Sequence, residues 1–119
     1  MDFTLGFSPC PNDCFIFDAL VHNKIDTQGI DFTIVMEDVE ALNNRAFKEE
    51  LDITKLSYHA FIYLTNQYAL LNSGSALGFN CGPLLVKDSK VKIENIDAAS
   101  IAIPGKYTTA NSLVPFALP

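Results

Sequence analysis

Three short polar stretches hold the side chains that are best placed for chemistry in this sequence of 119 residues. They are Ser8–Asp13, Lys55–Ser57 and Lys106–Ala110. Each stretch precedes residues with apolar helical spacing, so its polar side chains would lie beside the free backbone N–H groups of a helix start. Backbone donors, hydroxyl groups and a lysine ammonium suit a small anion such as a carboxylate. The spacing therefore predicts an anion-binding site.

Each stretch also has a purely structural interpretation. Asp13 and Ser57 are residue types that commonly cap helices, and Thr108 and Thr109 are capping types as well. Asn43 lies beside the apolar face of an expected helix and is either a surface amide or part of a cleft. The sequence leaves these alternatives open.

The elements that position these stretches alternate between strand and helix. Period-2 and β-branched patterns predict strands, and apolar spacing of 3.6 predicts helices after about residues 12, 39, 58 and 108. Strands are expected at 2–7, 30–36, 52–56 and 100–103, with a strand-like run at 84–86. This alternation predicts an α/β fold with a mainly parallel sheet, whose ligands bind beyond the carboxyl ends of the strands. Pro115 predicts a short or kinked last helix.

Composition excludes several classes of partner. The net charge is −6 and no run of Lys or Arg occurs, so nucleic acid is not expected as a partner. No apolar run approaches the roughly 20 residues of a membrane span, and no signal peptide precedes the first strand, which predicts a cytoplasmic protein without a membrane partner. Cys10, Cys14 and Cys81 are odd in number and lack paired spacing, so they are expected to be free thiols rather than metal ligands.

The two histidines have ordinary structural explanations. His22 falls near a helix C-terminus, where a solvated imidazole is favoured by the helix dipole. His59 lies inside a helix without a carboxylate at a recognisable spacing, which favours a packing or surface role. Neither is expected to be catalytic.

The motifs together resemble one enzyme family. Ser8-Pro9-Cys10-Pro11-Asn12-Asp13, Lys55-Leu56-Ser57-Tyr58, Ser73-Gly74-Ser75-Ala76-Leu77-Gly78 and Pro104-Gly105-Lys106-Tyr107-Thr108-Thr109-Ala110-Asn111 are similar to 1,4-dihydroxy-6-naphthoate synthase of the futalosine route to menaquinone. The resemblance implies a two-lobed fold like that of type II periplasmic binding proteins. It also implies a cofactor-free lyase that converts cyclic dehypoxanthinyl futalosine to 1,4-dihydroxy-6-naphthoate.

The resemblance implies roles for particular residues. Asp13 corresponds to a supporting aspartate of the cleft, and the substrate-contacting residues are Lys55, Leu56, Ser57, Thr109, Ala110 and Asn43. No metal and no cofactor are implied, and the substrate is a small carboxylate. The histidine that acts as the family's base has no counterpart in this chain, since neither His22 nor His59 occupies its place.

Several further expectations follow from the resemblance. The chain is expected to be a fragment, with residues 1–80 forming part of a first α/β lobe and residues 81–119 forming a crossover and the start of a second lobe. Such a fragment is expected to be inactive alone and to form a homo-oligomer through uncovered apolar faces. Two other functions remain open, namely the related chorismate dehydratase and a non-catalytic binding module for small carboxylates.

Overall fold

The computed structural model describes residues 1–76, 78–80, 82–90, 92, 96 and 98–118. Its elements are, in order, β1 (Asp2–Phe7), α1 (Pro11–Val21), β2 (Asp31–Met36), α2 (Val39–Phe47), β3 (Ile53–Thr54), α3 (Tyr58–Ile62) and α4 (Thr109–Ala117). The strands and helices predicted before residue 65 are therefore confirmed, although β3 and α3 are shorter than expected.

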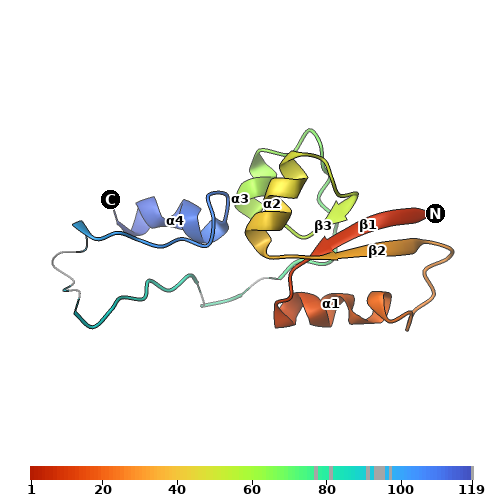
Figure 1. Cartoon of the computed structure of the whole chain (residues 1–119), viewed down its shortest axis with the longest axis horizontal. Helices are drawn as coiled ribbons and strands as arrows, with labels where there is room; N and C mark the ends of the chain where they lie inside the picture. The colour runs from red at the N-terminus through yellow and green to blue at the C-terminus, as the bar shows by residue number, and fades with distance from the viewer. Residues whose placement is uncertain (77, 81, 91, 93–95, 97, 119) are drawn as a thin grey trace.

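The sheet is parallel and has β1 at its centre. The strand order is β2-β1-β3, with Leu5 paired to Ile34 on one side and to Ile53 on the other. The connection from β1 to β2 runs in one direction across the sheet and the connection from β2 to β3 runs back. Because such crossovers are right-handed, their helices lie on opposite faces, and Figure 1 shows α1 on one face and α2 on the other. The predicted parallel α/β sheet is confirmed.

Apolar side chains fill both faces of this sheet. Phe7 and Phe17 stack with ring centroids 4.9 Å apart on the α1 face, where Leu5 is also buried. On the α2 face, a Cβ on Gly6 would lie 2.8 Å from the Leu51 Cδ1 and 3.0 Å from the Leu42 Cδ2. Glycine at position 6 therefore allows α2 to pack directly against the central strand.

The described residues between α3 and α4 do not form the strands that their sequence predicts. The predicted buried strand at 100–103 is wrong, since these residues form no strand and Ile103 is 44% exposed. The strand-like run at 84–86 is not a strand either, and Leu84 is 86% exposed. Strand patterns become strands only where a neighbouring strand takes up their backbone hydrogen bonds, and none of the described residues pairs with these two runs. In Figure 1, residues 82–90 extend away from the sheet and residues 98–108 return toward α3, which α4 contacts.

The last helix has the predicted short length. α4 is nine residues long and ends two residues after Pro115. The Thr108 hydroxyl caps α4 by accepting a hydrogen bond from the Asn111 backbone N–H at 3.3 Å. Over the described residues, no helix is long and apolar enough to cross a membrane.

Candidate functional site

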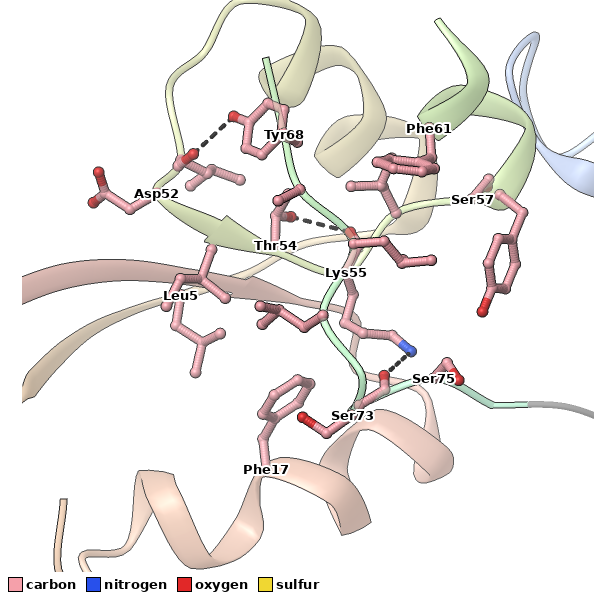
Figure 2. Close-up of a pocket in the computed structure, with 18 of the residues that line it drawn as sticks. Leu5, Phe17, Asp52, Thr54, Lys55, Ser57, Phe61, Tyr68, Ser73 and Ser75 are labelled. Carbon is pink, nitrogen blue, oxygen red and sulfur yellow. Dashed lines mark hydrogen bonds between the residues drawn. The ribbon is translucent and has the colours of Figure 1, made fainter. Parts of the chain in front are cut away.

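A pocket of about 780 Å³ runs along β3. Asp52 lies at the amino end of this strand, and Lys55 and Ser57 lie just beyond its carboxyl end (Figure 2). The walls include the aromatic side chains of Phe17, Phe32, Tyr58, Phe61 and Tyr68. A volume within about 300–1,000 Å³, apolar walls and a few polar groups are the features of sites for small molecules.

Lys55 is the cation at the polar end of the pocket. Its Nζ donates a hydrogen bond to the Gly74 carbonyl at 2.8 Å and lies 3.4 Å from the Asp13 Oδ1. The Asp13 Oδ2 accepts hydrogen bonds from the Ser8 backbone N–H at 3.1 Å and from the Ser8 hydroxyl at 2.8 Å. Asp13 and Ser8 are both buried, and together they hold the lysine ammonium at the end of the strand.

Asn43 fixes the Ser57 turn from the buried side. Its Oδ1 accepts a hydrogen bond from the Ser57 backbone N–H at 3.0 Å, and its Nδ2 donates to the Ser57 Oγ at 3.3 Å. The Asn43 side chain is fully buried in α2. Because the Ser57 oxygen accepts in this contact, its hydroxyl hydrogen remains able to donate to a ligand in the pocket.

Thr109 reaches the same pocket from the start of α4. The turn before it is held against the first part of the chain by Tyr107, whose ring centroid lies 4.5 Å from that of Phe47. The His59 Nδ1 lies 3.2 Å from the Thr108 carbonyl oxygen. Residues that are about 50 positions apart in the sequence thus share one site.

The structure decides the capping alternatives. Asp13 is not a helix cap, because Cys10 occupies the N-cap position of α1 and the Asp13 carboxylate turns back to Ser8. Ser57 occupies the N-cap position of α3 but makes no capping hydrogen bond with its side chain. Of the two threonines, Thr108 is the cap. The hydroxyl of Thr109 takes part in no hydrogen bond among the described residues, and Thr109 is exposed where it lines the pocket.

Of the predicted site residues, the structure brings four to the pocket wall, namely Lys55, Leu56, Ser57 and Thr109. Asp13 and Asn43 lie behind this wall and contact Lys55 and Ser57. Ala110 is half-buried in α4 and does not line the pocket. The predicted convergence of three strand ends is wrong in one respect, because the described residues 98–105, which lead directly into the 106–110 stretch, form no strand.

Sequence reasoning missed Asp52 and Tyr68, which line the pocket, and Glu40, whose carboxylate accepts a hydrogen bond from the Lys106 backbone N–H. Hydrogen bonds from the Thr4 backbone N–H and hydroxyl hold the pKa of Asp52 below its usual value. Burial raises the pKa of Tyr68, whose hydroxyl donates to the Leu51 carbonyl at 2.7 Å. Pairing across more than ten residues leaves no local spacing signal, so these partners could not be found from sequence patterns.

The histidines do not line this pocket. His22 ends α1, is exposed and lies 3.1 Å from Asp18, as expected for a residue at a helix C-terminus. His59 packs edge-on against Tyr63 with centroids 5.5 Å apart. Cys10 and Cys14 are free and exposed, whereas Cys81 lies outside the described residues. Within the described ranges, no group of three or more His, Cys, Asp and Glu residues could hold a metal ion.

The fold and the pocket define a parallel α/β protein with polar donors where its edge strand ends and aromatic walls along that strand. The sequence matches the family described as menaquinone biosynthesis over residues 3–119, and the chain belongs to that family.

Two curated relatives make this relationship more specific, and both are named 1,4-dihydroxy-6-naphthoate synthase. The Thermus thermophilus protein is 44% identical over 110 residues, which are 92% of this chain and 39% of the relative. The Streptomyces coelicolor protein is 36% identical over 107 residues, which are 89% of this chain and 36% of the relative. The chain therefore spans less than two fifths of the length of the curated relatives it matches.

A solved structure has the same arrangement of elements. A crystal structure of an Archaeoglobus fulgidus protein superposes with a TM-score of 0.88 at 37% identity. The match covers 98% of this chain and 42% of the solved chain.

Proposed function

We propose that this chain binds and orients the substrate of a cofactor-independent lyase that converts cyclic dehypoxanthinyl futalosine to 1,4-dihydroxy-6-naphthoate in menaquinone biosynthesis. The relationship to two proteins named for this activity supports the reaction. The observation that carries the role of this chain is the pocket beside β3, where an ammonium and two hydroxyls accompany aromatic walls.

The donors are suited to a carboxylate. Lys55 supplies positive charge, and the hydroxyls of Ser57 and Thr109 each offer a hydrogen to an oxygen of the ligand. Asp13 and Gly74 restrain the ammonium before any ligand arrives. A carboxylate held at this end directs the remainder of a bicyclic acid along the aromatic wall, and such orientation is a recognised source of rate acceleration.

The proton-removing base of the proposed reaction is not assigned to His22 or His59. His22 is bonded at the end of α1, and His59 faces the Thr108 carbonyl and the tyrosine rings. The residues of this chain thus provide binding and orientation, while general-base catalysis requires a group within about 3 Å of the atom that carries the reacting proton.

The finer fold assignment is also a proposal. A two-lobed fold like that of type II periplasmic binding proteins fits a parallel sheet followed by an extended segment and a returning helix. In this fold residues 1–80 contribute to the first lobe, and residues 81–119 form a crossover and begin the second. As a biosynthetic enzyme, the protein is proposed to act in the cytoplasm on a small carboxylate.

Binding of 1,4-dihydroxy-6-naphthoate tests this proposal directly. Titration followed by ¹H–¹⁵N NMR is expected to shift the amide resonances of Ser57 and Thr109 in the unaltered chain. The double variant Ser57→Ala, Thr109→Val is expected to bind the acid at least tenfold more weakly, because each lost hydrogen bond to a charged group is worth about 1.5–3 kcal/mol. Equal affinities of the two proteins would contradict the proposed site.

Turnover tests the reaction itself. A chimaera in which this chain replaces the matching part of the Thermus thermophilus relative is expected to form the naphthoate from cyclic dehypoxanthinyl futalosine. The same chimaera is expected to leave chorismate unchanged, whereas dehydration of chorismate would favour the related dehydratase. Tight binding of small carboxylates without turnover of either compound would favour a non-catalytic binding module.

A further inference from the structure

Glu40 joins two turns that are far apart in the sequence. One carboxylate oxygen, Oε1, accepts a hydrogen bond from the Lys106 backbone N–H at 3.0 Å. The other, Oε2, accepts a hydrogen bond from the Asn43 Nδ2 at 3.4 Å, and the same Nδ2 donates to the Ser57 Oγ. Glu40 therefore contacts the turn that leads to Thr109 and, through Asn43, the turn that carries Ser57.

The turn before α4 is shaped to receive this carboxylate. A Cβ on Gly105 would overlap the Oε2, Cδ and Cγ atoms of the Glu40 side chain. Gly105 does not have the positive φ found at Gly29 and Gly74, so its backbone conformation does not itself require glycine. The absence of a side chain at position 105 instead leaves room for the approach of Glu40.

We propose that Glu40 is a positioning residue that fixes the Ser57 turn and the Gly105–Thr109 turn relative to each other, so that their hydroxyls converge on one ligand carboxylate. This proposal rests on the proposed function, in which Ser57 and Thr109 hold that group. Glu40 does not line the pocket and acts through Asn43 and the Lys106 backbone.

The charge of Glu40 makes the proposal sharply testable. A negative side chain near an anion site repels the anion, so removing the charge alone would strengthen binding of a carboxylate. Loss of positioning has the opposite sign, because two hydroxyls that no longer converge bind one carboxylate more weakly. The direction of the change in affinity therefore separates a positioning role from a bystander charge.

The experiment compares affinities for 1,4-dihydroxy-6-naphthoate by NMR titration of the 119-residue chain. Glu40→Gln is expected to weaken binding about fivefold, because Gln keeps one acceptor oxygen but places an NH₂ donor against either the Lys106 N–H or the Asn43 amide. Glu50→Gln is the matched control, because Glu50 is exposed and its carboxylate forms ion pairs with Arg45 and Lys48. This variant should change the affinity by less than twofold. Unchanged or tighter binding by Glu40→Gln would overturn the proposal.

Gly105→Ala provides a second variant that keeps the Glu40 charge and the sequence of α2. The added methyl group should displace the Glu40 side chain and weaken binding to a similar extent. Because both changes break the same link, the double variant should bind no more weakly than either single variant. Additive losses would overturn the proposal, and Gly105→Ala decides the matter if Glu40→Gln fails to fold.

NMR spectra of the ligand-free chain test the positioning role of Glu40 independently of the proposed function. If the unaltered chain binds no naphthoate, the proposed function fails, but the link between the turns is still measurable. Gly105→Ala should then shift the Ser57 amide resonance through Glu40 and Asn43, and this shift should vanish in a Glu40→Ala background. A Ser57 resonance that ignores the change at Gly105 would overturn the positioning role.

Discussion

The first 68 residues and the segment from 69 to 118 have similar apolar patterns but very different structures. Among the described residues, every buried apolar side chain lies between Leu5 and Leu64, where β1 has a parallel neighbour on each side. The later segment contains Phe79, Leu84 and Val86, which are each more than 80% exposed. The difference shows that a segment with an apolar pattern becomes a strand or a core element only under two conditions. Other parts of the chain must pair with its backbone N–H and C=O groups, and they must cover its apolar side chains.

The largest expected effect is self-association, which would bury apolar side chains of residues 69–118 that are exposed in the single chain. We propose that two copies of the chain associate through the exposed apolar side chains of the later segment, because burying apolar surface is favourable by about 25 cal/mol per Å². Light scattering should then give twice the monomer mass at high protein concentration. The double variant Leu84→Asp, Val86→Asp should shift the equilibrium to monomer, whereas a compact monomer of the unaltered chain at all concentrations would contradict this prediction.

Matched truncations in the two regions should have unequal effects on stability. Leu5→Ala removes a side chain that is 1% exposed at the centre of the sheet and should lower the free energy of unfolding by about 2–5 kcal/mol. At protein concentrations low enough for the chain to be monomeric, Leu84→Ala removes the same atoms from an 86% exposed position and should change the free energy of unfolding by less than about 0.5 kcal/mol. Urea unfolding measures both values, and a similar loss for the two variants would show that Leu84 is covered in solution.

Asp13→Asn, in the first 68 residues, should lower catalytic turnover much more than it lowers the free energy of unfolding. Asn keeps an acceptor for Ser8 but loses the ionic contact with Lys55, so stability should fall by only about 1 kcal/mol. Formation of naphthoate by the chimaera should fall about tenfold or more, since the ammonium is no longer held in place. Unchanged kinetics alongside a large loss of stability would make Asp13 a structural residue alone.

The smallest expected effect is a change in acid sensitivity at Asp52. Hydrogen bonds from Thr4 lower the pKa of Asp52 in the folded chain below its ordinary value of 3.8. The group therefore contributes stability above that value, and the contribution is lost as the pH falls through the folded pKa. Asp52→Asn should flatten the decline in stability below about pH 4, as measured by urea unfolding at several pH values. An identical pH profile for the two proteins would contradict the assigned role of the Thr4 contacts.

Local patterns determined much of the first region. Alternation of apolar side chains located β1 and β2, and apolar side chains at helical spacing located α1 and α2. These features depend on neighbours within a few residues, which a sequence displays directly. The same local information placed Lys55 and Ser57 just after β3, where they line the pocket.

Only the tertiary structure decided what those residues contact. The sequence did not show that Asp13 bonds Ser8 rather than capping α1, or that Asn43 holds Ser57 across 14 positions. The link from Glu40 to the Lys106 backbone spans 66 positions. Residues 100–103 form no strand, although their sequence pattern favoured one. Strand pairing and side-chain contacts over such separations depend on which surfaces the folded chain brings together, and that arrangement has no local signature in the sequence.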